Sequence, residues 1–241
     1  MKITVLTLFP EMYESVVTAS LLGKSKAVIE RVHIRDFSTN KHHNIDDSPY
    51  GGGAGLLIQV EPVHRALEFV DPNHTARRIL MSPQGTPLTQ AKLQELSQLD
   101  NMVLVAGHYE GFDERVRTFI DEEISIGDYV LTGGELPSMV VIDGVVRLLE
   151  GTVGNPESLA ADSFQRPRLE GPQYTRPETY LDMKVPEVLL SGNHKLIARY
   201  QTKESLRRTY LRRPELLTDL SAAEKELMDE ILKELEASKK S

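Results

Sequence analysis

The sequence predicts an α/β protein with a mostly parallel sheet flanked by helices, followed by a small helical C-terminal domain. Two observations carry this prediction. Strand-like and helix-like segments alternate up to residue 150, as expected for strands joined by crossover helices. After an irregular stretch at 151–179, which is rich in Gly, Pro and Ser, residues 193–213 and 221–237 have helical patterns instead.

The predicted elements follow each other along the chain. Short apolar runs predict strands at 2–8, 27–37, 77–82, 101–107 and 122–131. Apolar residues at helical spacing predict helices at 10–17, 60–70, 89–99, 113–120 and 136–150. Ser221 followed by Glu224 forms a capping-box pattern at the start of the last helix. The long irregular stretch 35–55 is of the kind that is usually functional or disordered.

Composition narrows the function classes. The chain has 241 residues and 40% hydrophobic residues, as soluble globular proteins do, and no apolar stretch long enough to span a membrane. The start of the chain predicts a first strand and not a signal peptide. The absence of cysteine excludes disulfides, thiolate chemistry and cysteine-based zinc sites. These features fit a cytoplasmic protein.

Charge is distributed unevenly. The net charge of −8 argues weakly against a nucleic-acid partner, because affinity for phosphates rests on Lys and Arg. Residues 193–213, however, hold seven basic residues against one acid, Glu204. One helix face should carry Lys195, Arg199, Lys203 and Arg207, with no flanking acids and with Tyr200 and Tyr210 interleaved. This pattern favours a polyanion partner over a merely solvated charged face.

Three glycine-containing segments follow predicted strands, where ligands usually bind in α/β sheets. They are "LMSPQGTPL", "VAGHYEGFDER" and "SIGDYVLTGGELP". Any one alone could be a plain tight turn, but three in succession favour a binding crevice. Common fingerprints do not fit: there is no Gly-x-Gly-x-x-Gly after a strand, "TASLLGKS" lacks the first glycine of a phosphate-binding loop, and no His-Glu-x-x-His motif occurs.

Several polar residues allow two interpretations. Asp162 could cap a helix or act as a general base in a loop beside the crevice. Arg147 could be solvated or could point into the site. The "YGGGAG" loop could be a plain surface loop, and the nearby His42, His43, Asp46 and Asp47 lack the spacing that would fix a metal geometry.

Taken together, the motifs "SPYGGGAG", "SPQG", "GHYEGFDER", "SIGDYVLTGGELP", "DSFQ", "QYTRP", "VPEVLLSGNH" and "RRPELL" resemble those of the bacterial tRNA (guanine-N1)-methyltransferases of the TrmD family. The resemblance covers nearly the whole chain in order. It implies a SPOUT fold, in which a trefoil knot binds S-adenosylmethionine, and a homodimer with active sites at the subunit interface. The implied reaction methylates N1 of guanine at tRNA position 37, next to the anticodon, and thereby preserves the reading frame.

The resemblance also implies domains and residue roles. Residues 1–153 would form the SPOUT domain, 154–172 an interdomain linker with the catalytic Asp, and 173–241 a helical tRNA-binding domain. Asp162 of the other subunit would be the general base, Arg147 would stabilise charge on the guanine, and Glu110 would orient the cofactor or guanine. The cofactor would contact Pro83, Gln84, Gly85, Gly107, Tyr109, Glu110, Gly111, Ser125, Ile126, Gly127, Asp128, Tyr129, Val130, Leu131, Gly133, Gly134, Leu136 and Pro137. The RNA would contact Gly52, Gly53, Ser163, Asn193, His194, Lys195, Arg199, Arg207 and Arg208. A dependence on Mg²⁺ is implied as well, although the sequence shows no dedicated ligand cage.

The chain departs from the family pattern at a few positions. His108 stands where many members have Arg, Thr132 where many have Ser, Glu150 where Pro is common, and Lys195-Leu196 where Ala-Lys is usual. Two other functions remain open at this point. One is a SPOUT enzyme acting on a ribosomal RNA base or a ribose hydroxyl, which would not need Asp162 as a base. The other is a noncatalytic RNA-binding protein, which would not need Asp162, Arg147 and Glu110 together.

Overall fold

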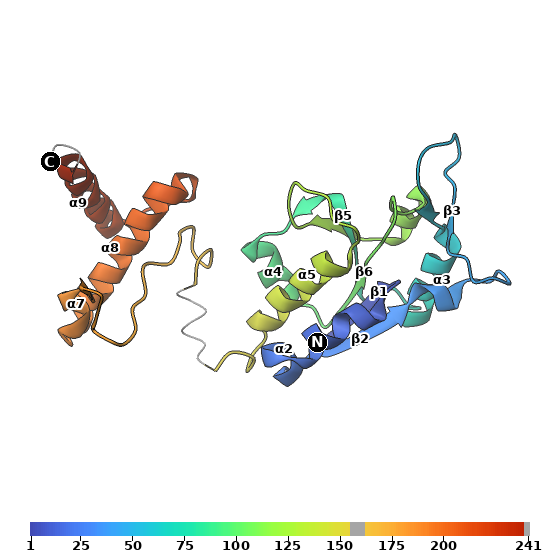
Figure 1. The fold of residues 1–241 in the computed structure, drawn as a ribbon, viewed down its shortest axis with the longest axis horizontal. Helices are drawn as coiled ribbons and strands as arrows, with labels where there is room; N and C mark the ends of the chain where they lie inside the picture. Colours follow the sequence, from blue (N-terminus) through green and yellow to red (C-terminus); the bar gives the residue numbers. More distant parts are fainter. Residues whose placement is uncertain (155–161, 239–241) are drawn as a thin grey trace. The chain divides into compact units, whose positions relative to one another are not determined.

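The computed structural model describes residues 1–154 and 162–238, and the chain divides into two compact units. The first unit is Met1–Gly154 and the second is Asn155–Ser241. Figure 1 shows the sheet in the first unit and the long helices of the second.

The first unit is built on a five-stranded parallel sheet with the order β2-β1-β6-β5-β7. Its strands are β1 (Lys2–Thr7), β2 (Val28–His33), β5 (Arg77–Pro87), β6 (Asn101–Val105) and β7 (Glu122–Ser125). All five predicted strands are present, and the prediction of a mostly parallel α/β sheet flanked by helices is confirmed.

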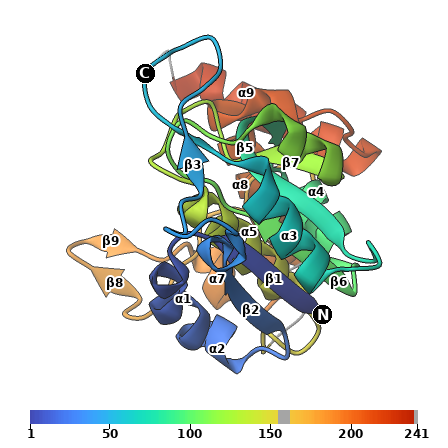
Figure 2. The same cartoon turned by 90° about the vertical axis from the view of Figure 1, so that its right-hand side faces the viewer.

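Alternating side chains along the strands pack against helices on both faces of this sheet. Met102 and Leu104 of β6 belong to one core cluster, together with residues of α4 (Gln90–Ser97) and α5 (Glu135–Leu148). Val103 and Val105 belong to the other, with α3 (Val60–Val70) and the 3₁₀ segments η2 (Ile34–Phe37) and η3 (Glu114–Phe119). Figure 2 shows α3 and α5 on opposite faces of the sheet.

Some elements differ from their predicted form. The helix predicted at 10–17 is a 3₁₀ turn, η1 (Pro10–Tyr13), that continues as α1 (Glu14–Thr18) and is followed by α2 (Ser20–Lys24). The strand predicted at 27–37 ends at His33, and the short helix predicted at 113–120 is the 3₁₀ segment η3. A small antiparallel pair, β3 (Asp46–Asp47) with β4 (Leu57–Ile58), lies in and just beyond the long irregular stretch.

The largest difference concerns the strand predicted at 122–131, because β7 ends at Ser125. Gly127 follows with a φ of 150°, and Tyr129 and Val130 are 56% and 82% exposed. β7 is an edge strand, so it pairs on one side only, and the apolar residues after it turn away from the sheet. Apolar composition predicted a strand here, whereas the chain forms a loop beside a cavity.

The second unit contains β8 (Thr179–Tyr180), β9 (Met183–Lys184), α7 (Glu187–Leu190), α8 (His194–Arg212), η4 (Pro214–Leu216) and α9 (Ala222–Ser238). Leu206 of α8 packs with Leu227, Met228 and Ile231 of α9 in a small core. The predicted capping box is present: the Glu224 carboxylate accepts from the backbone and hydroxyl of Ser221, whose Oγ accepts from the Glu224 N–H. Among the described residues, no helix has the length and apolar character needed to cross a membrane.

Candidate functional site: a backbone-lined pocket

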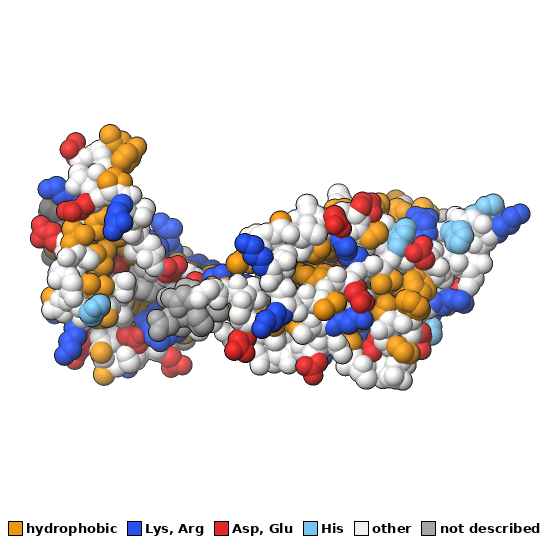
Figure 3. Space-filling model, turned by 90° about the horizontal axis from the view of Figure 1, so that it is seen from below, with side chains coloured by type: hydrophobic (Ala, Val, Ile, Leu, Met, Phe, Trp, Pro, Cys, Tyr) orange, Lys and Arg blue, Asp and Glu red, His pale blue; other side chains and the backbone are white. Residues whose placement is uncertain are grey.

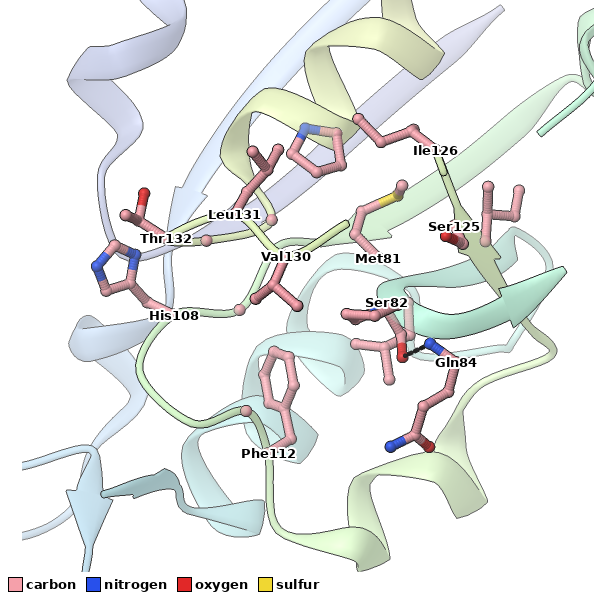
Figure 4. Close-up of a pocket in the computed structure, with 18 of the residues that line it drawn as sticks. Met81, Ser82, Gln84, His108, Phe112, Ser125, Ile126, Val130, Leu131 and Thr132 are labelled. Atoms are coloured by element: carbon pink, nitrogen blue, oxygen red, sulfur yellow. Dashed lines mark hydrogen bonds between the residues drawn. The ribbon is translucent and has the colours of Figure 1, made fainter. Parts of the chain in front are cut away.

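A cavity of about 370 Å³ lies where β5, β6 and β7 end, in the first unit. Its walls come from the three glycine-containing segments that the sequence singled out. Figure 4 shows Met81, Ser82 and Gln84 from β5, His108 and Phe112 from the loop after β6, and, around the rest of the wall, Ser125, Ile126, Val130, Leu131 and Thr132. The volume lies in the range of small-ligand sites.

The structure brings most of the proposed cofactor residues to this cavity. All of them line it except Gly85, Asp128 and Leu136. Gly85 packs against β7, where an added Cβ would lie 2.5 Å from the carbonyl carbon of Glu123. Asp128 and Leu136 are exposed.

Other lining residues were not among the predicted ones. They include Met81, Ser82, His108, Phe112 and Arg117. All lie next to the quoted motifs or within them, so proximity to the three loops was the signal that could have found them.

The turn at Gly133 and Gly134 lies against the loop after β6. The Gly134 N–H donates to the carbonyl oxygen of Gly107 at 2.6 Å, and Gly133 forms an antiparallel bridge with His108. A Cβ on Gly134 would lie 2.8 Å from the Cα of Ala106, which is backbone that cannot yield. Gly134 is therefore needed because backbone meets backbone at this point, whereas a Cβ on Gly133 would meet the side chains of Glu135 and His108.

Arg117 joins the polar side of the cavity. Its Nε donates to Glu123 Oε1 at 2.8 Å, its Nη2 donates to Gln84 Oε1 at 3.2 Å, and its Nη1 pairs with Glu114. Gln84 is further held by its N–H, which donates to Ser82 Oγ at 3.1 Å (Figure 4). The guanidinium of Arg117 thus connects Gln84 of β5 with Glu123 of β7 and Glu114 of η3.

Glu110 lies against the end of the glycine-rich loop. A Cβ on Gly55 would lie 2.2 Å from Glu110 Cγ, and the Glu110 N–H donates to Leu56 O. Ile58 donates its N–H to Gly111 O, which extends this contact. Gly52 and Gly53 are exposed with φ values of 81° and 142°. Glycine is therefore needed in this loop for two reasons: Gly52 and Gly53 adopt positive φ values, and Gly55 comes close to Glu110.

Arg147 and Asp162 belong to different units. Arg147 is half-buried in the last turn of α5. Asp162 is half-buried at the start of a tight loop in the second unit, and no helix begins at it among the described residues. The reading of Asp162 as a helix cap therefore finds no support in the described part of the chain.

The loop that follows Asp162 is anchored to the long helices. Ser163 Oγ accepts from the Glu170 N–H at 2.9 Å. Leu169 donates its N–H to Thr209 Oγ1 of α8, and Arg168 forms an ion pair with Glu224 of α9 at 2.5 Å. This part of the segment proposed as a linker packs within the second unit.

The predicted basic face of α8 is compensated, which corrects the expectation that no acids flank it. The carboxylates come from α9, except for Glu204 of α8 itself. Arg199 pairs with Glu230 at 2.5 Å, and Lys203 pairs with Glu230 at 2.9 Å and Glu234 at 2.7 Å. Arg207 pairs with Glu204 at 3.0 Å and with Glu234. Hydrogen bonds from these cations hold the pKa values of Glu230 and Glu234 below their ordinary value. Figure 3 shows blue and red side chains intermixed over the second unit.

The other proposed RNA residues have different surroundings. Arg208 Nη1 donates to the carbonyl oxygens of Glu170 and Gly171, both at 3.1 Å. Asn193 caps α8 by accepting from the N–H groups of Lys195 and Leu196. The side chains of His194 and Lys195 are exposed beside this cap.

The described residues contain no group of three or more His, Cys, Asp and Glu side chains able to hold a metal ion. His42, His43, Asp46 and Asp47 therefore form no such group with their described neighbours.

Comparison with known proteins gives a consistent result. Residues 1–219 match the family described as "tRNA (Guanine-1)-methyltransferase TrmD". A Lacticaseibacillus paracasei protein named tRNA (guanine-N(1)-)-methyltransferase is 54% identical, with 92% of this chain and 89% of that protein covered. Proteins of the same name from Enterococcus faecalis and Geobacillus kaustophilus are 50% and 51% identical, covering 99% and 94% of this chain and 98% and 95% of their own lengths.

Proposed function

Because this chain belongs to the TrmD family of tRNA (guanine-1)-methyltransferases, we propose that it methylates N1 of the guanine at tRNA position 37, next to the anticodon. The methyl donor is S-adenosylmethionine. The family match supports a tRNA guanine as the methyl acceptor. The backbone-lined cavity is the observation that supports S-adenosylmethionine as the donor. The cytoplasm, where tRNA matures, is the proposed location.

The cavity fits a nucleoside-containing donor. Its loops expose backbone N–H and C=O groups because glycines stand at Gly107, Gly133 and Gly134, where a Cβ would meet neighbouring atoms within 3 Å. Apolar side chains such as Ile126, Val130 and Leu131 provide the remaining wall, which suits an adenine ring. When bound, S-adenosylmethionine supplies an activated methyl group on its sulfonium.

The proposed chemistry requires a base because guanine N1 carries a proton. We assign this role to the Asp162 carboxylate, which accepts the N1 proton as the N1–CH₃ bond forms and the sulfur–methyl bond breaks. General bases of this kind contribute about 10²–10⁴-fold to a rate. Arg147 stabilises negative charge that develops on the guanine, and Glu110 orients the reactants. Residues 168–171 are anchored to α8 and α9. This supports the assignment of Asp162 as the base, because the anchored loop holds it in position.

The family's SPOUT trefoil knot is placed in the C-terminal part of the first unit. The hydrogen bond from Gly134 to Gly107, which returns the loop after β7 to the loop after β6, supports this placement. A homodimer that brings Asp162 of one copy to the cavity of the other completes the site. Leu136 and Val140 support such an interface, because they lie one turn apart on α5 and are 52% and 46% exposed.

The proposed tRNA surface includes the exposed Gly52 and Gly53 of the first unit and, from the second unit, Ser163, Asn193, His194 and Lys195. Arg199 and Arg207 pair with carboxylates of α9. They can contact the tRNA only if its phosphates replace these carboxylates. Arg208 joins it from a position where its guanidinium already fixes the 170–171 backbone. Extrusion of the target guanine from its stack would bring N1 into the site.

The test is methyl transfer from labelled S-adenosylmethionine to two unmodified tRNA transcripts that differ only in guanine or adenine at position 37. We expect transfer to the guanine transcript alone, lost in Asp162→Asn and retained in Asp219→Asn, an exposed carboxylate of the same unit. Equal transfer to both transcripts would refute the position, and full activity of Asp162→Asn would refute the base. A dependence on Mg²⁺ stays a prediction, checked by adding EDTA to the same assay.

A further inference from the structure

His108 lines one end of the cavity, beside Thr132 in Figure 4. Its Nδ1 atom is buried and has no hydrogen-bond partner. The nearest acidic atom is Oε2 of Glu135, 3.6 Å away. A buried nitrogen without a partner costs free energy, so its orientation toward a carboxylate needs an explanation.

Glu135 is itself buried, with 2% of its side chain exposed in the first turn of α5. Its Oε1 accepts a hydrogen bond from Thr7 Oγ1 at 3.0 Å, and the helix N-terminus favours its negative charge. A buried carboxylate gains most from a cationic partner, because desolvation strengthens the attraction and raises the cost of isolation.

The other ionisable neighbours do not supply that cation. Burial raises the pKa of Tyr13, the hydrogen bond with Ser138 lowers it by a smaller amount, and the charge of Glu135 raises it further, so its hydroxyl stays neutral. The rings of Tyr109 and Phe9 both meet the His108 ring edge-on, with 5.4 Å and 4.9 Å between ring centroids. Among these groups, the imidazole of His108 is the one that becomes a cation when it is protonated.

The pair lies directly behind the turn that closes the cavity. A Cβ added to Gly133 would lie 2.2 Å from Glu135 Oε2 and 2.5 Å from His108 Nδ1. Gly133 also bridges His108 through the backbone. The imidazole and the carboxylate therefore lie directly against the Gly133–Gly134 turn.

We propose that His108 is a positioning residue for the donor pocket and that protonation of its imidazole, acting through Glu135, tightens binding of S-adenosylmethionine. The proposal rests on the donor assigned under the proposed function. The 3.6 Å between Nδ1 and Oε2 is too long for a hydrogen bond, and a neutral imidazole carries one proton, which can sit on either nitrogen. An imidazolium has N–H groups on both nitrogens, so Nδ1 donates to Oε2 and draws the turn against the loop after β6. Coupling between two sites is reciprocal, so binding must then take up a proton.

The experiment is calorimetric titration of the full-length protein with S-adenosylmethionine at about pH 6 and about pH 8, the range in which histidine changes charge. Four variants accompany the wild type: His108→Arg, which is always charged, His108→Asn, which never is, Glu135→Gln, and His42→Asn, an exposed histidine control. Repeating each titration in two buffers of different ionisation enthalpy measures proton uptake. Thermal unfolding of each unliganded variant checks that it is folded.

We expect wild type and His42→Asn to bind about fivefold or more tightly at the lower pH, the smaller end of typical coupling effects, and to take up protons. His108→Arg should bind equally well at both pH values, and His108→Asn and Glu135→Gln should bind weakly at both, all without proton uptake. A folded His108→Asn that keeps the wild-type pH dependence overturns the proposal, as does a wild type that binds equally at both pH values. A wild type that binds at neither pH instead refutes the proposed donor.

Discussion

The backbone N–H of Gly134 donates to the carbonyl oxygen of Gly107 over 2.6 Å, and this bond closes one side of the pocket. The two residues follow different strands of the sheet. Their contact leaves no space for a side chain, because a Cβ added to Gly134 would lie within 3 Å of the Cα of Ala106 and the N of Gly107.

Gly134→Ala should therefore displace the turn. We expect a cost of about 1–3 kcal/mol in the free energy of unfolding, as for other overpacked sites, and a loss of donor affinity of about tenfold or more. Urea unfolding and calorimetry measure the two effects. Gly154→Ala is the matched control, because nothing lies within 4 Å of its added Cβ. Normal binding by Gly134→Ala would mean that the turn is not part of the site.

Asp71 and Arg78 form a buried ion pair that joins the end of α3 to β5. Arg78 Nε donates to Asp71 Oδ2 at 2.9 Å, and both side chains are 3% exposed. Asp71→Ala removes the buried carboxylate and leaves the guanidinium only the longer contact with Glu68, 3.9 Å from Nη2, so we expect a loss of about 3–5 kcal/mol in the free energy of unfolding. Asp100→Ala, at an exposed carboxylate, should change it little. A loss below about 1 kcal/mol would contradict this reading.

The same pair predicts a pH dependence. Burial raises the pKa of Asp71, but hydrogen bonds from the Thr75 and Ala76 N–H groups and from Arg78 outweigh it, and the net pKa is lowered from its ordinary 3.8. Its stabilisation is therefore complete above 3.8 and is lost as the pH falls through the lower folded-state value. Asp71→Asn should flatten the dependence of unfolding free energy on pH in this acidic range. An unchanged slope in acid titrations followed by circular dichroism would refute the assignment.

The carboxylates of α9 should compete with RNA for the cations of α8. Glu230→Gln combined with Glu234→Gln removes the α9 carboxylates that pair with Arg199 and Lys203, and one of the two carboxylates that pair with Arg207. We expect tighter tRNA binding with a steeper salt dependence, by roughly one unit of log–log slope for each cation that gains a phosphate.

The matched control for this prediction is Glu226→Gln combined with Asp229→Asn. It removes the same charge from exposed positions of α9. If both pairs raise affinity equally, the effect comes from net charge alone. If neither changes the slope, the α8 cations lie outside the RNA surface.

Thr209 should affect catalysis from a distance, through the loop that follows Asp162. Its Oγ1 accepts from the Leu169 N–H at 3.0 Å, and Ser205 Oγ donates to Leu169 O at 2.5 Å. Thr209→Val leaves the Leu169 N–H without this acceptor, which should lower the free energy of unfolding by about 1–3 kcal/mol and loosen the loop. We expect a lower kcat with unchanged donor Kd, whereas Thr218→Val, at an exposed threonine, should change neither. An unchanged kcat would show that this anchor does not position the base.

Local patterns were sufficient for much of the fold. The continuous apolar run of β6 predicts a strand in a sheet that is covered on both faces, and Met102 and Val103 indeed belong to different core clusters. The three loops were predictable as neighbours because parallel strands end at one edge of the sheet. Ser221 and Glu224 predicted their own cap, since a capping box involves residues only three apart.

Features that depend on contacts distant in sequence were not predictable. The basic pattern of α8 is correct as composition, but pairing with Glu230 and Glu234 depends on how two helices pack. Tyr129 and Val130 resemble a strand by composition, and only the position of β7 at the sheet edge explains why they leave it. His108 drew attention only as a departure from a family pattern, because its partner Glu135 lies on another element.

The glycines of the pocket have a consequence for drug resistance. An inhibitor that binds the main chain of these loops would depend little on side-chain identity, so a resistant mutant would have to change the path of the backbone itself. At Gly107, Gly133 and Gly134 an added Cβ would lie within 3 Å of other atoms of the first unit. Substitutions that weaken such an inhibitor would therefore also damage the enzyme, and escape by single mutations at these positions should be rare.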